Sequence, residues 1–260
     1  MTSSALASRG AHLLDLAYEL VTRELKLRYK RSTLGVLWSL VTPLAQLVVF
    51  TLVFQSVLRL NVPNYPLFVF VGVLAWNWFQ TAVFTASGAI TENRDLVRRP
   101  GFPSVVLPAV TVATNFVHYV LAVPILLAFV VWSEAPLTPA VLWLVPLLAL
   151  QFALTLGVAY VVASLNVTFR DVQHLLGVAL TLLFYLTPVF YASESVPEQY
   201  RAALNLNPLG RLLDAQRAVL LEGRTPDPAS LASVAALALV LLVVGFAVFR
   251  SARERFVEEL

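Results

Sequence analysis

Residues Glu24 to Phe54 read ELKLRYKRSTLGVLWSLVTPLAQLVVFTLVF, a basic segment followed directly by an uncharged apolar one. No Asp, Glu, Lys or Arg occurs between Leu34 and Leu58. A helix of about 25 residues reaches roughly 37 Å, which exceeds the roughly 30 Å thickness of a bilayer's hydrocarbon core. The stretch therefore predicts a membrane-spanning helix that starts directly after a basic anchor.

The rest of the chain repeats this pattern. The 260 residues are 59% hydrophobic and 13% charged, against about 45–50% and about 25% in soluble domains. We therefore expect an all-α integral membrane protein that forms a single membrane domain over residues 1–260. The predicted transmembrane helices are six, at residues 34–58, 67–90, 105–132, 140–165, 175–191 and 230–249.

The segments between these spans have patterns of their own. Residues 11–31 place Leu14, Ala17, Val21 and Leu25 at helical spacing, which predicts an N-terminal amphipathic interface helix on the membrane surface. Residues 91–104, TENRDLVRRPGFPS, are polar and basic. Residues 192–229 contain two short amphipathic patterns separated at Asn207-Pro208. These are either two re-entrant helices dipping into the outer leaflet or a solvent-exposed cap on the span ends.

Charge distribution predicts the orientation. With six spans both termini lie on one side, and 13 of the 18 lysines and arginines fall on that side. The remaining five are outer arginines. Because short cytoplasmic loops are enriched in positive charge, both termini are expected in the cytoplasm. The basic residues cluster beside the spans, which favours contact with membrane lipids and gives no reason to expect nucleic acid as a partner.

Several kinds of chemistry are missing from the sequence. It has no cysteine, no zinc pattern among its three histidines, no phosphate-binding P-loop and no H-E-x-x-H motif. We expect no catalytic residue, no metal and no cofactor bound by this chain. The acids of the outer segment are interspersed with arginines and suit solvated faces better than a catalytic site. His118 is the one ionisable residue inside the spans, and without an acidic relay it argues against a proton-coupled carrier.

Aromatic residues concentrate in the first, second and fifth predicted spans. Part of this set suits the aromatic belts found at membrane interfaces. Phe50 and Phe54, however, lie one turn apart on one face, and ring faces suit the apolar faces of sugars. For any single ring, contact with lipid or packing is the alternative. These aromatic residues include Trp38, Phe50, Phe54, Trp76, Trp78, Phe79, Phe84, Phe184, Tyr185, Phe190 and Tyr191.

Six stretches together resemble one family. The stretches are, in chain order, RELKLRYKRSTLGVLWSLVTPL, YPLFVFVGVLAWNWF, RDLVRRPGFPSVVLP, LNVTFRDVQHLL, LTPVFY and LNPLGRLLDAQRAVL. They are similar to landmarks of the ABC exporter permeases that move polysaccharides and polyol phosphates, such as O-antigen, capsule and teichoic acid chains. The correspondence covers essentially the whole chain.

The resemblance implies a function and partners. The chain would be the permease subunit of an ATP-driven exporter of a lipid-linked polysaccharide or polyol-phosphate polymer in a bacterial cytoplasmic membrane. It would be no enzyme itself. It would form a homodimer joined to two copies of an ABC ATPase subunit, which would hold ATP and Mg. The alternatives are an ABC permease for a small amphipathic drug or lipid and, from another class, a membrane-embedded glycan-modifying enzyme.

The resemblance also implies roles for residues. A cytoplasmic coupling helix in residues 91–104 would sit in the ATPase groove, the first and fifth spans would line the conduit and its lateral gate, and the outer helices would form an exit gate. The implied coupling residues are Arg94, Asp95, Leu96, Arg98, Arg99 and Phe102, with Arg170 and Asp171 in the other inner loop, where a local ion pair is the alternative. The implied conduit residues are Trp38, Phe50, Phe54, Trp76, Phe184, Tyr185 and Tyr191, and those of the outer gate are Tyr200, Asn207, Pro208 and Leu212.

Overall fold

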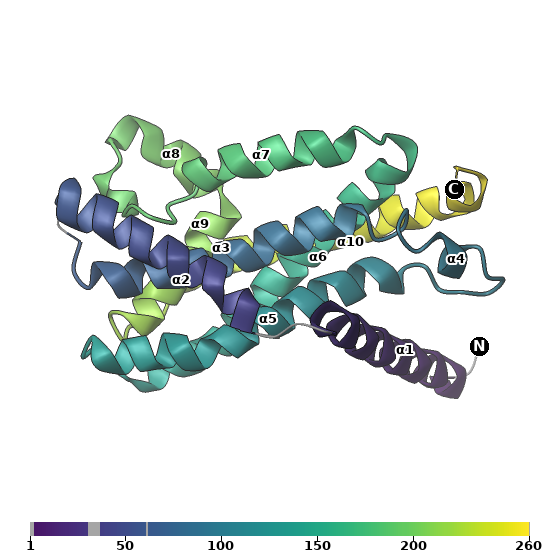
Figure 1. The fold of residues 1–260 in the computed structure, drawn as a ribbon, viewed down its shortest axis with the longest axis horizontal. Coiled ribbons are helices and arrows are strands. Elements are labelled where there is room, and N and C mark those ends of the chain that lie inside the picture. Colours follow the sequence, from purple (N-terminus) through teal and green to yellow (C-terminus); the bar gives the residue numbers. More distant parts are fainter. Residues whose placement is uncertain (1–2, 31–36, 61, 260) are drawn as a thin grey trace.

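The protein is an integral membrane protein built from helices. The computed structural model describes residues 3–30, 37–60 and 62–259, and no strand occurs in this part of the chain (Figure 1). Five of the described helical segments are long and apolar enough to cross a membrane. They are α2 (Trp38–Phe50) continued by the π-helix η2 (Thr51–Val57), α3 (Tyr65–Ser87), α5 (Val106–Trp132), the 3-10 turn η3 (Pro139–Trp143) continued by α6 (Leu144–Thr168), and α10 (Pro228–Glu259).

A shorter apolar helix, α7 (Val172–Leu186), stands where residues 175–191 are predicted to span. Its 15 residues reach only about 22 Å, which is less than a hydrocarbon core. The helix ends five residues before the predicted end because the residue before a proline disfavours helical dihedrals. Thr187 precedes Pro188 and is extended, with φ −99° and ψ 136°.

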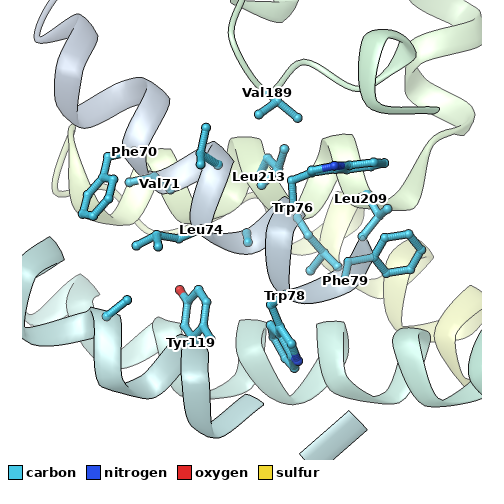
Figure 2. Close-up of a cluster of buried hydrophobic side chains, with 14 of the residues drawn as sticks. Phe70, Val71, Leu74, Trp76, Trp78, Phe79, Tyr119, Val189, Leu209 and Leu213 are labelled. Atoms are coloured by element: carbon cyan, nitrogen blue, oxygen red, sulfur yellow. The ribbon is translucent and has the colours of Figure 1, made fainter. Parts of the chain in front are cut away.

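Helix α3 forms the centre of the protein. It contacts α2, α5, α6, α7 and the outer helix α9 (Pro208–Leu220), and most of its side chains are buried. Trp76 and Trp78 point to opposite sides of it: Trp76 lies near Leu209 on one side, and Trp78 points toward the helix of Tyr119 on the other (Figure 2). A helix that is apolar on every face is expected to be enclosed by other helices, as α3 is.

Helices α6 and α10 pack along each other through two glycines. A Cβ added to Gly157 would lie 2.6 Å from the backbone carbon of Leu241, and one added to Gly245 would lie 2.2 Å from the carbonyl oxygen of Gly157. No side chain fits at either place, so the two backbones approach each other directly. Helix α10 also runs ten residues past the predicted span end at 249, and buried Phe256 packs on Phe249 at 5.1 Å between ring centroids.

Helix α1 (Ser3–Tyr29) packs against α5 (Figure 1). Thr114 donates a 3.2 Å hydrogen bond to the Glu24 carboxylate, and the ring of Tyr29 meets that of His118 edge-on at 5.7 Å. Burial raises the pKa of the Glu24 carboxyl above its ordinary value. The amphipathic helix predicted at residues 11–31 thus packs on one side against α5 of the same chain. Residue 31 and the predicted span start at 34 lie outside the described residues.

The segments between spans are short helices. The predicted coupling segment at 91–104 contains α4 (Arg94–Val97), which is a single turn. The outer segment contains α8 (Glu198–Leu206) and α9, which meet at Asn207. A helix thus occupies each of the two amphipathic patterns predicted on either side of Asn207-Pro208.

Candidate translocation surface and coupling segment

Aromatic rings from three parts of the chain form one cluster, which we call the aromatic cluster: Phe50 and Phe54, Trp76, and Phe184, Tyr185, Phe190 and Tyr191. The rings of Phe50 and Phe54 lie 6.0 Å apart, and those of Phe50 and Phe184 lie 6.1 Å apart. Trp76 lies 5.6 Å from Phe184. Six of the seven predicted conduit residues therefore lie together, because α2 with η2, α3 and the end of α7 converge here.

Phe190 is the centre of this cluster, although it was not among the predicted conduit residues. Its ring lies 5.7 Å from Phe50, 5.0 Å from Phe54, 5.6 Å from Phe184 and 5.2 Å from Tyr191. Ring pairs at 4.5–7 Å attract one another beyond simple burial. Phe190 could have been found from the sequence, since it belongs to the same aromatic concentration as its neighbours.

The aromatic cluster has an exposed side. Tyr185 is 61% exposed, whereas Trp76 is fully enclosed. Phe54 lies in the π-helix η2, a helix type that is rare and often found at functional sites. The surface offers ring faces and no charge, so it can contact a polar chain weakly at many places without binding it tightly at one. Trp38, the seventh predicted conduit residue, lies apart on the first turn of α2.

The coupling segment stands on a small hydrophobic core of its own. Leu96 and Phe102 are partly buried and pack against a cluster that includes Ile90 and Phe256, and Arg253 of α10 donates to the Phe102 carbonyl oxygen at 3.2 Å. The five charged residues of the segment are all exposed: Glu92, Arg94, Asp95, Arg98 and Arg99. The segment thus exposes its charges at the surface while its apolar residues are held in place by this core.

The second predicted coupling loop is the turn that contains Arg170 and Asp171. Arg170 and Asp171 are both exposed in the turn between α6 and α7. The structure describes both side chains and places no salt bridge between them. The alternative of a local ion pair that shapes this turn is therefore not supported.

Asn207 fixes the outer helices to the end of α7. Its side-chain oxygen accepts from the backbone N–H groups of Leu209 and Gly210, and its amide donates to the Thr187 hydroxyl at 2.8 Å. This is an N-cap, and Pro208 at the first helical position suits the start of α9. Of the other predicted gate residues, Leu212 is buried and Tyr200 is exposed beside an apolar cavity of about 680 Å³.

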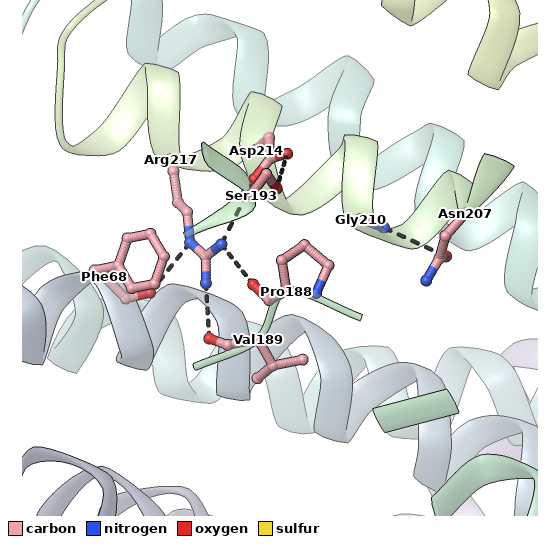
Figure 3. Close-up of polar contacts among 8 residues, drawn as sticks. All are labelled: Phe68, Pro188, Val189, Ser193, Asn207, Gly210, Asp214 and Arg217. Carbon is pink, nitrogen blue, oxygen red and sulfur yellow. Dashed lines mark hydrogen bonds and ion pairs between the residues drawn. The ribbon is translucent and has the colours of Figure 1, made fainter. Parts of the chain in front are cut away.

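Arg217 is the polar residue that the sequence pattern missed. Its guanidinium donates to the carbonyl oxygens of Pro188 at 2.6 Å, Val189 at 2.7 Å and Phe68 at 3.3 Å, and it lies 3.5 Å above the Phe68 ring (Figure 3). Asp214, one turn earlier, is 3.6 Å away. Burial lowers the pKa of Arg217 to about 10, so it remains a cation at neutral pH.

This residue joins α9, α3 and the segment after α7. A Cβ on Gly72 would lie 2.7 Å from the Arg217 guanidinium, so α3 has a glycine where the arginine passes. One signal could have revealed it: Arg217 lies between Leu213 and Leu220 on the apolar face of α9, where a charged side chain needs a partner.

Comparisons with known proteins identify the family of this chain. The model of the family described as ABC-2 type transporter matches residues 16–221, a range that includes every predicted coupling, conduit and outer gate residue. The chain is 40% identical to the O-antigen export system permease protein RfbA of Myxococcus xanthus over 248 residues, which cover 94% of this chain and 95% of that protein.

Two further relatives cover a similar extent. An O-antigen export system permease protein RfbA of Klebsiella pneumoniae is 30% identical over 96% of both chains. The polysialic acid transport protein KpsM of Escherichia coli is 27% identical over 90% of this chain and 92% of its own length. The resemblance found in the six sequence stretches is confirmed, and the family match extends from within α1 through α9. The chain therefore belongs to the ABC-2 type transporter family.

Proposed function

We propose that this chain is the membrane permease subunit of an ABC exporter for a cell-surface polysaccharide of the O-antigen or capsule kind. The observation that carries this proposal is the similarity to O-antigen export permeases over nearly the full length of both chains. The chain is a transporter subunit and not an enzyme, since the relatives are permease and transport proteins. This removes the glycan-modifying enzyme from the alternatives.

Membership in this family implies an ATPase partner, and further details belong to the proposal. Two copies of the chain would pair, each joined to one ATPase subunit that binds ATP and Mg. The protein would lie in a bacterial cytoplasmic membrane with both termini in the cytoplasm. The sixth crossing would be made by α7 together with the residues that follow it, up to Tyr191. The cargo would be a polymer on a lipid anchor, with polyol-phosphate chains such as teichoic acid as a variant.

The exposed faces of α2 and α7 support a homodimer. These two elements expose large apolar side chains: Val48 on α2, Leu52 on its continuation η2, and Val178, Leu182 and Tyr185 on α7. A second copy facing them would enclose a path bordered by the exposed side of the aromatic cluster. Uncharged walls of this kind suit a hydrated polymer that must slide without being trapped.

The coupling segment suggests how ATP use would move these walls. Closure of two ATPase subunits would push on the exposed charges around α4. Because Leu96 and Phe102 pack on the same core as Phe256, the force would pass to α10 and, through its close contact with α6, to the rest of the bundle. Arg217 would pass it on to the outer helices.

A deletion strain and a purification together test the function. Removal of the gene should abolish surface polysaccharide, and the purified protein should bring its ATPase subunit with it. Surface polysaccharide that stays intact while sensitivity to amphipathic drugs rises would favour the small-molecule permease instead. A protein that binds no ATPase encoded beside it would contradict both forms of transport.

A further inference from the structure

A polar cavity of about 620 Å³ lies between the end of α1, the start of α2, the second half of α3 and the middle of α5. Its volume is in the range of small-molecule sites. None of the sixteen described residues around it is Asp or Glu, whereas Arg28, Tyr29 and His118 contribute a cation, a hydroxyl and an imidazole. The cavity is therefore rich in hydrogen-bond donors and has no carboxylate among its described walls.

The contact between Arg28 and His118 determines which imidazole nitrogen holds the proton. A guanidinium nitrogen of Arg28 lies 3.3 Å from Nδ1 of His118. Arginine can only donate, so Nδ1 must be the acceptor and the neutral ring has its proton on Nε2. That Nε2 is buried and has no partner among the described residues. It is a donor without an acceptor.

Two more donors at this cavity are also buried without an acceptor among the described residues. The Tyr29 hydroxyl and the Trp78 indole nitrogen are both buried without a hydrogen-bond partner in the described part of the chain. The side-chain oxygens of Gln46 and Gln80 already accept hydrogen bonds, from Asn77 and Trp76 respectively. Buried polar groups are nearly always paired, so several unpaired donors around one cavity indicate a missing acceptor.

We infer that this cavity binds the phosphate headgroup of a lipid. A phosphate supplies only acceptor oxygens and negative charge, which matches a wall of donors that includes an arginine. A neutral sugar is a poorer match, because it brings no negative charge to face the Arg28 guanidinium. Trp38 and Ser39, the first residues of the apolar helix α2, line the cavity. A lipid could therefore place its headgroup here while its chains stay in the bilayer.

Two kinds of lipid have a phosphate headgroup, and each would give the cavity a different role. One is an ordinary anionic membrane phospholipid. The other is the phosphate-linked anchor of an exported polymer, and only this second source rests on the proposed function. If the anchor binds here, Arg28 would hold the substrate beside the first span before the polymer enters the conduit.

Binding is measured without export, on the full-length permease with its ATPase partner in nanodiscs of zwitterionic lipid. The probes are a polyprenyl diphosphate, phosphatidylglycerol and, as the phosphate-free comparison, a polyprenol. We expect Arg28→Gln to weaken phosphate-lipid binding at least about tenfold, because charge-assisted hydrogen bonds are lost. Tyr29→Phe, which removes one hydroxyl only, should weaken it about threefold. Lys26→Gln, an equal loss of charge on the exposed face of α1, should change it less than about twofold.

The relative affinities of the three probes identify the lipid that binds. Tighter binding of polyprenyl diphosphate than of phosphatidylglycerol assigns the cavity to the polymer anchor, and equal binding assigns it to membrane phospholipid. Polyprenol that binds as tightly as polyprenyl diphosphate, or equal losses in Arg28→Gln and Lys26→Gln, would overturn the phosphate site. Because no export is measured, failure here would leave the proposed function standing, and loss of the proposed function would leave a phospholipid site intact.

Discussion

The guanidinium of Arg217 lies 2.6 Å from the carbonyl oxygen of Pro188, and this contact joins the outer helix α9 to the segment that follows α7. Thr187 and Pro188 end α7, which leaves backbone carbonyls without helical partners in a buried place. A single arginine satisfies those of Pro188 and Val189 together. Phe190 of the aromatic cluster comes directly after these two residues, and its carbonyl oxygen accepts a 2.8 Å hydrogen bond from the Tyr65 hydroxyl.

Arg217→Met should destabilise the protein by about 3 kcal/mol, because buried carbonyl oxygens lose charge-assisted hydrogen bonds. Arg217→Lys should recover only part of the loss, since an ammonium lacks the planar fork. The measurement is the thermal unfolding midpoint in detergent. Arg224→Met is the control, because Arg224 is exposed and paired with Glu222 at the surface. Equal midpoints for the Arg217 and Arg224 variants would refute the structural role of Arg217.

Gly157→Ala and Gly245→Ala should each cost about 1–3 kcal/mol, because the new methyl group would overlap the backbone of the facing helix. Gly177→Ala in α7 is the matched control. A Cβ there meets only the Phe84 ring at 3.8 Å, so the change should be neutral or stabilise by up to about 1 kcal/mol. Unfolding midpoints of the three variants, compared with the parent, test the α6–α10 contact.

Tyr185→Leu should slow polymer export by up to about tenfold while it leaves stability nearly unchanged, because it removes an exposed ring face worth about 0.5–1.5 kcal/mol and keeps apolar bulk. Export is followed as polymer that reaches the far side of the membrane, with the unfolding midpoint measured in parallel. Phe246→Leu on α10, a partly exposed ring outside the aromatic cluster, is the control. An equal effect at both positions would show that the rings only contact lipid.

Reversal of charge at Arg98 and Arg99 should separate ATP use from transport. We expect Arg98→Glu combined with Arg99→Glu to lower export at least about tenfold while ATP hydrolysis continues, because opposing charge at a docking surface weakens specific contact. Both side chains are exposed, so the fold should tolerate the change. Hydrolysis and export are measured on the same preparation. Undiminished export would remove the coupling role from this segment.

The contact between α1 and α5 should depend on pH through Glu24. Burial raises the pKa of its carboxyl, so the docked helix disfavours the charged form. The contact should strengthen as the pH falls from neutrality toward 4.5, the ordinary value, and weaken as the pH rises through the raised pKa.

Glu24→Gln should remove this pH dependence and still accept the hydrogen bond from Thr114. Hydrogen exchange of α1 amides, corrected for intrinsic rates, reports the contact. Glu19→Gln on an exposed position of the same helix should keep the pH dependence. A pH dependence that survives in the Glu24 variant would mean that another group is responsible.

Much of the helix layout could be predicted because it depends on local composition. The uncharged run from Leu34 to Leu58 predicts a span from its own length, whatever the rest of the fold. Asn207-Pro208 predicts a helix start from the chemistry of its own side chains. The end of α7 could have been placed better, since Pro188 signals it directly. The short α4 turn was harder to predict, because its residues are held by Phe256, far along the chain.

The sequence by itself determined that this protein crosses a membrane, where its main helices lie and which family it belongs to, because hydrophobic length and local motifs are properties of neighbouring residues. Only the tertiary structure decided which polar groups find partners. Arg217 reaches across to Pro188, whereas buried donors of Tyr29, Trp78 and His118 stay unpaired beside Arg28. Whether a donor is satisfied depends on residues brought together from distant parts of the chain, and no local pattern contains that information.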